Sequence, residues 1–197
     1  MKTIVIASSN TGKLREFAAL LVPFDFAAIP QSQLGVTEAD EPYITFVENA
    51  LTKARHASRA TGLPALADDS GICVPVLQGA PGVYSARYAG EPKSDQRNNE
   101  KLIAALQGQP DRRAFYYCAL VLVMHADDPH PLIADGEWHG EVIDTPRGVG
   151  GFGYDPYFWL SAYGLTAAEL PAEIKNKISH RGRAMQQLAQ KLQQRAQ

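Results

Sequence analysis

The pattern of apolar and polar positions predicts alternating strands and helices along the first third of the chain. An apolar run predicts a strand at residues 2–7, and helical spacing of apolar residues predicts a helix over 11–21. A short strand is expected at 26–30, followed after a polar segment by a long helix at about 43–60.

The middle of the chain predicts two strands and a capped helix. The strands, at 65–69 and 72–77, flank the sequence Asp-Asp-Ser-Gly at 68–71. Ser94 can cap a helix that runs to about residue 107, because a serine hydroxyl accepts a hydrogen bond from the first helical turn.

Two long strand-like stretches follow, at 114–125 and 131–143. The first is apolar nearly throughout, as a central strand is, and the second alternates, as a strand with one wet face does. After a glycine-rich loop at 145–155 the chain ends in a helix from about Ser179. This order predicts an α/β fold with a mixed sheet flanked by helices.

Composition narrows the class of protein. Apolar residues make up 45% of the 197 residues, enough for a sizeable core, and the formal net charge is −2. No run of five or more like charges and no apolar stretch of membrane-spanning length appears, so stable nucleic-acid or membrane binding is not expected. Cys73 and Cys118 sit in apolar runs, which favours buried thiols in a reduced compartment. We therefore expect a cytoplasmic globular protein.

The turn between the first strand and helix is a candidate phosphate site. It reads Ser8-Ser9-Asn10-Thr11-Gly12-Lys13, and a helix N-terminus with small residues and a lysine suits an anion. The P-loop pattern fails here, because Ala7 stands for its first glycine and Leu14 for its last hydroxyl residue. A capped helix with a solvated lysine is an equally good interpretation of this turn alone.

Two adjacent carboxylates, Asp68 and Asp69, end an apolar segment before Ser70 and Gly71. Adjacent side chains on a strand point to opposite faces, so both can serve one site only if the strand bends, which Gly71 permits. Carboxylate oxygens suit Mg²⁺, and both aspartates are candidates. The alternative is a turn in which an aspartate caps backbone amides.

The long helix offers Lys53 as a cation beside a phosphate site, and Glu41 upstream as a second metal carboxylate. A solvated helix face and a helix-entry acid are the alternatives.

Two later motifs are candidates for binding a nucleobase. The loop Arg-Gly-Val-Gly-Gly-Phe-Gly-Tyr-Asp-Pro offers Phe152 and Tyr154 for stacking, unless these aromatics fold back on the core. Ser179 can cap the last helix, which places His180 and Arg181 in its first turn, where cations oppose the helix dipole. Such local violations mark functional sites, although a basic surface cluster that includes Lys175 is the alternative.

Six blocks in this order resemble the inosine triphosphate pyrophosphatase family over nearly the whole chain. They are SSNTGK at 8–13, TFVENALTKA at 45–54, ADDSG at 67–71, GAPGVYSARYAG at 79–90, GGFGYDP at 150–156 and SHRG at 179–182. Each block alone is weak, and the six together are specific. The first block usually begins Thr-Gly-Asn in this family, so Ser8-Ser9-Asn10 departs from the pattern.

The resemblance implies one inosine-triphosphatase-like domain over 1–197, an elongated mixed sheet, and two lobes with the active site in the cleft between them. It implies hydrolysis of ITP, dITP or XTP to the monophosphate and pyrophosphate with Mg²⁺, by a homodimer. By motif, Asp69 and Lys53 are catalytic, and Asp69, Glu41 and Asp68 are candidate metal ligands. The substrate-binding residues by motif are Ser8, Ser9, Asn10, Thr11, Gly12, Lys13, Ser70, Phe152, Gly153, Tyr154, Asp155, Lys175, His180 and Arg181.

Two other functions fit parts of this pattern. One is a pyrophosphatase of the same fold that acts on pyrimidine or modified nucleotides, and the other is a nucleotide-binding module without catalysis. The glycine-aromatic loop with SHRG favours purines over the first, and carboxylates beside a phosphate loop favour hydrolysis over the second.

Overall fold

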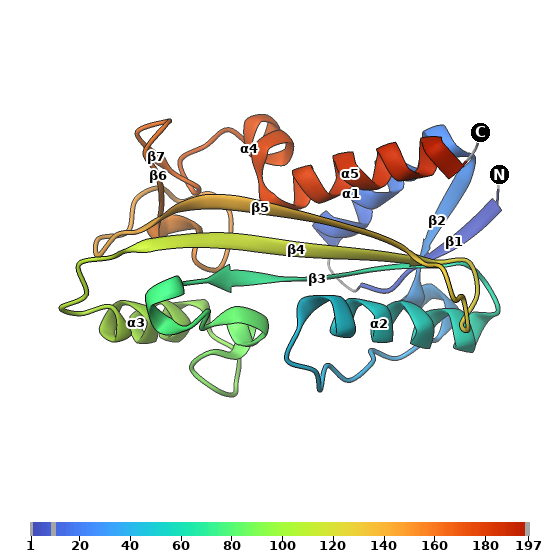
Figure 1. The fold of residues 1–197 in the computed structure, drawn as a ribbon, viewed down its shortest axis with the longest axis horizontal. Coiled ribbons are helices and arrows are strands. Elements are labelled where there is room, and N and C mark those ends of the chain that lie inside the picture. The colour runs from blue at the N-terminus through green and yellow to red at the C-terminus, as the bar shows by residue number, and fades with distance from the viewer. Residues whose placement is uncertain (1, 9–10, 196–197) are drawn as a thin grey trace. The chain divides into compact units, whose positions relative to one another are not determined.

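A computed structural model describes residues 2–8 and 11–195 of the chain. Within these residues seven strands form one sheet in the order β2-β1-β3-β4-β5-β6-β7 (Figure 1). The strands are β1 (Lys2–Ile6), β2 (Phe26–Pro30), β3 (Ala65–Cys73), β4 (Arg113–Val123), β5 (Leu132–Val142), β6 (Phe158–Leu160) and β7 (Leu165–Thr166). The helices are α1 (Thr11–Leu21), α2 (Phe46–Thr61), α3 (Asp95–Ala105), α4 (Ala172–Ile178) and α5 (His180–Arg195).

The sheet is mixed, as the sequence predicts. β1 pairs in parallel with both β2 and β3, whereas β5–β6 and β6–β7 are antiparallel pairs. β4 is buried over most of its length and β5 alternates between buried and exposed residues, so the expected central and half-wet strands are both confirmed.

The chain divides into two compact units. The first comprises residues 1–69, 118–135 and 184–197, and the second comprises 70–117 and 136–183. Strands β3, β4 and β5 and helix α5 each contribute residues to both units. The single domain and the cleft between lobes that the resemblance implies stay predictions.

The first unit has its own apolar core. α2 lies on one face of its strands, and α1 and the C-terminal part of α5 lie on the other (Figure 1). The core is formed by buried side chains from β1, α1, β3, β4 and α5, among them Ile4, Phe17, Leu66, Leu120 and Leu188. Full burial of each such side chain contributes about 1.5–3 kcal/mol, so this core anchors the turn and strand end that carry the predicted phosphate site.

The second unit is built around aromatic side chains. Its core includes Tyr116, Trp138, Tyr154 and Phe158, together with aliphatic residues of α3 and of the strands. Tyr116 meets Phe158 edge-on, with ring centroids 4.7 Å apart, a favourable arrangement of two ring quadrupoles. Tyr116, Trp138 and Phe158 come from strands β4, β5 and β6, whereas Tyr154 comes from the glycine-rich loop, so the core holds this loop against the strands.

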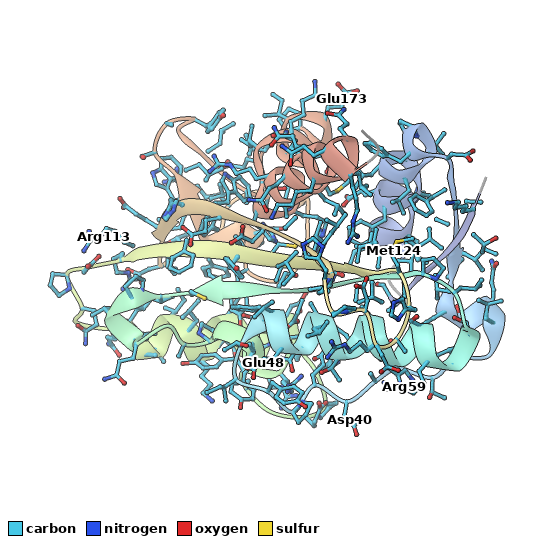
Figure 2. All side chains as sticks on the ribbon, turned by 45° about the vertical axis from the view of Figure 1, so that its right-hand side comes forward. Asp40, Glu48, Arg59, Arg113, Met124 and Glu173 are labelled. Atoms are coloured by element: carbon cyan, nitrogen blue, oxygen red, sulfur yellow. The ribbon has the colours of Figure 1, made fainter. Side chains whose placement is uncertain are left out.

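α2 begins at Phe46, three residues later than the spacing predicts. Thr45 caps the helix: its Oγ1 accepts a hydrogen bond from the Glu48 amide and donates one to the Glu48 carboxylate at 2.5 Å. This reciprocal cap fixes the start of the helix at residue 46. Charged side chains such as Glu48 and Arg59 cover the outward side of α2 (Figure 2), where Arg59 pairs with Asp127 at 3.0 Å.

The prediction of two strands on either side of Asp-Asp-Ser-Gly is wrong. Residues 65–73 form one continuous strand, β3, and residues 75–77 form a 3-10 turn instead of strand. Gly71 is buried within the strand and does not break it. Asp68 and Asp69 therefore lie inside a regular strand, and their side chains take opposite faces.

Three short elements were not predicted: α4, β6 and β7. They span only seven, three and two residues, too few for a period to be read from the sequence. Ser179 does precede the last helix as expected, and its Oγ accepts a hydrogen bond from the Gly182 amide at 3.3 Å. No helix within residues 2–8 and 11–195 is long and apolar enough to cross a membrane.

The close approach of β5 and β6 requires glycine at position 140. A Cβ on Gly140 would lie 2.5 Å from the Trp159 carbonyl oxygen and 2.8 Å from the Phe158 ring. We expect Gly140→Ala to lower the free energy of unfolding by about 1–3 kcal/mol, because the strands must separate to admit the methyl group. Urea unfolding measures this. Glu141→Ala, an exposed neighbour, is the control, and an equal loss in both variants would contradict the packing argument.

Candidate active site

Asp68 and Asp69 of β3 each meet a lysine from a different helix. The Lys13 Nζ of α1 lies 2.7 Å from Asp68 Oδ2, and the Lys53 Nζ of α2 lies 3.5 Å from Asp69 Oδ1. Because the two helices cover opposite faces of the strands, the alternation of β3 sends one carboxylate to each. Neither aspartate is more than 8% exposed, so each needs its cation to be stable when ionised.

Lys53 joins Asp69 to Glu41. Its Nζ lies 2.6 Å from Oε1 of Glu41, a residue of the polar segment before α2, and 3.5 Å from Asp69 Oδ1. Burial lowers the pKa of Lys53, but the charges of Asp69, Asp68 and Glu41 outweigh burial and raise its pKa above the usual value. Lys53 therefore stays charged at neutral pH, as a group that neutralises phosphate must.

Asn49 is a site residue that was not predicted. It is fully buried on α2, and its Nδ2 donates to Asp69 Oδ2 at 3.2 Å. The same amide accepts from the Tyr43 N–H at 3.1 Å and donates to the Tyr43 carbonyl at 3.2 Å. One side chain thus fixes both the carboxylate and the segment that carries Glu41. Its position one helical turn before Lys53 is the signal that could have identified it.

Asp69 is suited to act as a base. Burial raises its pKa above the ordinary aspartate value, Lys53 and Asn49 lower it, and Glu41 and Asp68 raise it further. The net shift is upward, which makes the ionised carboxylate a better proton acceptor near neutral pH.

Glu41 and Asp69 are the pair that fits a magnesium ion. The two carboxylates pair with the same ammonium, that of Lys53, so their oxygens lie around one positive charge. Mg²⁺ takes one or two carboxylates and keeps several waters, which this pair can supply. In the part of the chain that the structure describes, no three acidic, histidine or cysteine side chains gather as a metal cluster, and Asp68 faces Lys13.

The predicted phosphate turn lies between β1 and α1. Lys13 is in the first turn of α1 and Gly12 precedes it, while Ser8 is separated from β1 by Ala7. Ser9 and Asn10 lie outside the described residues, as does the side chain of Thr11. Lys13, the third residue of α1, reaches Asp68 of β3 with its ammonium, and its role in holding phosphate stays a prediction. Ser70 follows Asp69 in β3.

The second unit gathers the predicted base-binding residues around Asp155. Its Oδ2 accepts from the Lys175 Nζ at 2.5 Å and from the Phe152 amide at 2.8 Å, and its Oδ1 accepts from the Tyr116 hydroxyl at 3.4 Å. Asp155 is 4% exposed, so three donors compensate for its burial. Burial, followed by the charge of Asp155, raises the pKa of Tyr116 well above its usual value, so its hydroxyl stays a donor.

The two aromatic residues of the glycine-rich loop have different roles. Phe152 is 61% exposed and its ring lies 5.4 Å from the Lys175 Nζ, so one face can receive a base. Tyr154 is buried, and its hydroxyl donates to the Ser85 carbonyl at 2.8 Å. The expectation that Tyr154 offers a stacking face is therefore wrong: it anchors the loop to the 3-10 helix η4 (Gly82–Arg87).

The His180 ring stacks on the aromatic side chains of Tyr116 and Trp138. Its ring stacks on Tyr116 at 4.8 Å and 12°, and Trp138 lies nearly parallel to it at 6.4 Å. Arg181 is also buried in the first turn of α5. Tyr116 and Trp138 were not predicted, because β4 and β5 give only the apolar pattern of strands.

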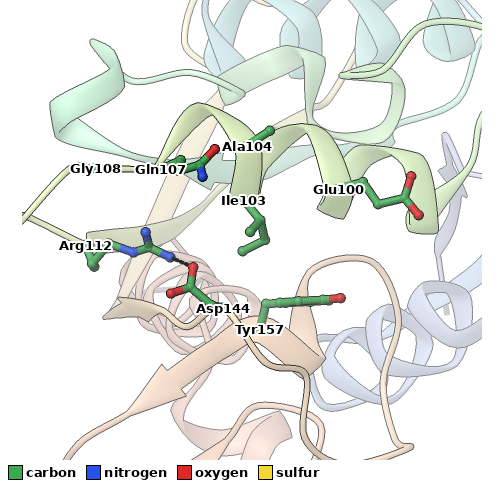
Figure 3. A pocket seen from close by; sticks show the side chains of 8 residues that line it. All are labelled: Glu100, Ile103, Ala104, Gln107, Gly108, Arg112, Asp144 and Tyr157. Atoms are coloured by element: carbon green, nitrogen blue, oxygen red, sulfur yellow. Dashed lines mark hydrogen bonds and ion pairs between the residues drawn. The ribbon is translucent and has the colours of Figure 1, made fainter.

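One cavity of the second unit lies away from these residues (Figure 3). Its volume is about 530 Å³. An ion pair between Arg112 and Asp144 spans it beside Tyr157. None of its lining residues belongs to the predicted site.

Comparison with known proteins identifies a family. The model of the Ham1 family matches residues 4–191. A dITP/XTP pyrophosphatase of Nitrosomonas europaea is 65% identical over 192 residues, covering 98% of this chain and 95% of that protein. A dITP/XTP pyrophosphatase of Chromobacterium violaceum is 62% identical over 189 residues, covering 96% of each chain.

Solved structures agree in fold. A HAM1 protein from Coxiella burnetii matches with a TM-score of 0.95 and 47% identity, covering 98% of this chain and all of that one. The Staphylococcus aureus Ham1 protein matches with a TM-score of 0.91 and 40% identity over the same share of both chains.

The raised pKa of Asp69 predicts an effect on stability. The folded protein holds the Asp69 proton more tightly than the unfolded chain, so ionisation of this carboxyl costs stability at pH values above its titration. We expect Asp69→Asn to raise the free energy of unfolding of the metal-free protein at neutral pH by about 0.5–2 kcal/mol. The Lys53 ammonium is not left unpaired in this variant, because it still has Glu41 as its ion-pair partner. Urea unfolding in EDTA measures this.

Asp68→Asn is the matched control. It leaves Lys13 without its buried carboxylate and should destabilise the protein. If Asp69→Asn is destabilised to the same degree, the argument from burial of Asp69 is wrong.

Proposed function

Because the chain belongs to the Ham1 family, we propose that it hydrolyses non-standard purine nucleoside triphosphates, such as ITP, dITP and XTP, to the monophosphate and pyrophosphate. The names of relatives that are 58–65% identical over at least 96% of the chain support this substrate class. The observation that carries the proposal is the group of two buried aspartates of β3 with Lys13 and Lys53.

The proposed reaction cleaves the bond between the α- and β-phosphates. Water attacks the α-phosphorus, the P–O bond to the β-phosphate breaks, and pyrophosphate leaves. Asp69 accepts the proton of the attacking water, a role that its raised pKa supports. Asn49 holds the Asp69 carboxylate in one orientation through its 3.2 Å hydrogen bond.

Charge neutralisation is the second requirement, because a triphosphate brings several negative charges. Lys13 at the start of α1 and Lys53 on α2 supply two cations, and residues 8–13 are proposed to hold the phosphates. Magnesium held by Glu41 and Asp69, with Asp68 as the other candidate, would add positive charge on the phosphate oxygens.

Base recognition is assigned to the second unit. Phe152 stacks on the purine, and Gly153 to Asp155 shape the loop around it. Lys175, His180 and Arg181 are the donors available to the purine 6-oxygen, which non-standard purines carry in place of the adenine amino group. Ser70 is proposed as a further substrate contact.

Two competing functions predict different outcomes. A binding module would bind nucleotide without releasing pyrophosphate, and a pyrimidine enzyme would prefer smaller bases. The raised pKa of Asp69 favours hydrolysis over binding alone, and the names of the relatives favour a purine substrate. The homodimer and the cytoplasmic location stay predictions.

The reaction is tested by coupling it to inorganic pyrophosphatase and measuring phosphate release from ITP, XTP, dITP and ATP, with Mg²⁺ or EDTA. We expect Mg²⁺-dependent turnover of the first three. Asp69→Asn should lower kcat by at least about 10²-fold, because an amide cannot accept the proton, and should leave nucleotide binding within about threefold. Near-normal kcat in this variant would move the base to Asp68, and an inactive wild type that binds ITP would establish a binding module.

Base selection is tested with Arg181→Ala and Phe152→Ala. A donor that faces the 6-oxygen of ITP would face the amino group of ATP. Loss of this donor should therefore reduce transition-state stabilisation by about 1–3 kcal/mol more for ITP than for ATP, which lowers the ITP-to-ATP ratio of kcat/KM roughly five- to 150-fold. Phe152 stacks on any purine, so its loss should lower kcat/KM for both by similar factors. Competition kinetics decides. An unchanged ratio in Arg181→Ala would remove Arg181 from base reading.

A further inference from the structure

Helix α3 binds both backbone polar groups of one residue in the glycine-rich loop, Gly153. The Gly153 amide donates to Asp95 Oδ2 at 2.8 Å, and the Gly153 carbonyl accepts from Asn99 Nδ2 at 2.9 Å. Asp95 and Asn99 are one helical turn apart, so they lie on one side of α3 and reach the same loop residue. Neither residue belongs to a motif that the proposed function uses.

The orientation of the Asn99 amide is fixed. Its Nδ2 also donates to the Asp95 carbonyl at 2.8 Å, and the residue is 6% exposed. The reverse orientation would place Oδ1 against two carbonyl oxygens, which is repulsive. Asn99 therefore acts as a rigid donor and not as a side chain that adapts to the loop.

Gly153 lies in the sequence between one exposed aromatic residue, Phe152, and one buried aromatic residue, Tyr154. Phe152 precedes Gly153 and is 61% exposed, whereas Tyr154 follows it and is anchored on the Ser85 carbonyl. Gly153 has φ +62°, a conformation that glycine adopts without strain. Two contacts thus fix the backbone that carries the Phe152 side chain. One is the hydrogen bond from the Phe152 amide to Asp155, and the other is the pair of hydrogen bonds from Asp95 and Asn99 to Gly153, called the grip below.

We propose that Asp95 and Asn99 are positioning residues for base recognition: by holding both polar groups of Gly153, they place the Phe152 ring before a purine arrives. The proposal rests on the proposed function of this loop. A loop ordered in advance loses less conformational freedom on binding, so the grip strengthens binding without contact to the substrate.

Removal of the grip should therefore act on KM. We expect Asp95→Ala to raise the KM for ITP about three- to tenfold, the cost of ordering one or two side chains on binding, with kcat within about twofold. Asp95→Asn keeps an oxygen acceptor for the Gly153 amide and should return KM to within about twofold of wild type. Asn99→Ser removes the second contact and provides an independent measurement of the same effect.

A double-mutant cycle separates positioning from general structure. In a Phe152→Ala background there is no ring to position, so Asp95→Ala should raise KM less than about twofold further. Gln96→Ala is the matched control: this exposed neighbour on α3 contacts Glu100 and not the loop. Additive effects of Asp95→Ala and Phe152→Ala, or an equal loss in Gln96→Ala, would overturn the proposal.

Hydrogen exchange of the ligand-free protein tests the grip without any substrate. Amides of residues 148–155 should exchange at least about fivefold faster in Asp95→Ala than in Gln96→Ala, while peptides of the first unit stay unchanged. Unchanged exchange in this loop would overturn the grip itself. Faster exchange together with an inactive wild type would instead reject the proposed function and leave the grip established.

Discussion

The structure depends on the neutralisation of two carboxylates that are buried side by side in a strand. Asp68 and Asp69 are 2% and 8% exposed, and a buried ionised group is tolerated only with a partner. Strand alternation sends them to opposite faces, so α1 and α2 must each bring a lysine to β3. Lys53 also pairs with Glu41, so the polar segment before α2 is held by the same cation.

Buried asparagines on helices hold the segments that must approach a ligand. Asn49 on α2 binds both polar groups of Tyr43, and Asn99 on α3 binds the carbonyl of Gly153. An amide both donates and accepts, so it can satisfy loop backbone that would otherwise be buried without partners. Asn98 does the same for the 3-10 helix η4, where it contacts the Ala86 carbonyl and the Ala89 amide.

The sequence predicted most of the long elements, and the aspartates and lysines that it proposed in the first unit do contact one another. It failed at β3 because Gly71 and the two aspartates have the composition of a turn, and only their partners on α1 and α2 make them strand residues. It could not separate Phe152 from Tyr154, because the local pattern is the same and only the Ser85 carbonyl, far away in sequence, decides which ring is buried.

Burial of Asp69 has two opposed consequences. Removal from water raises its pKa, which suits a proton acceptor, and the same removal costs stability whenever the group is ionised. Lys53 and Asn49 reduce that cost without reversing the shift, because Glu41 shares the ammonium of Lys53 and repels Asp69.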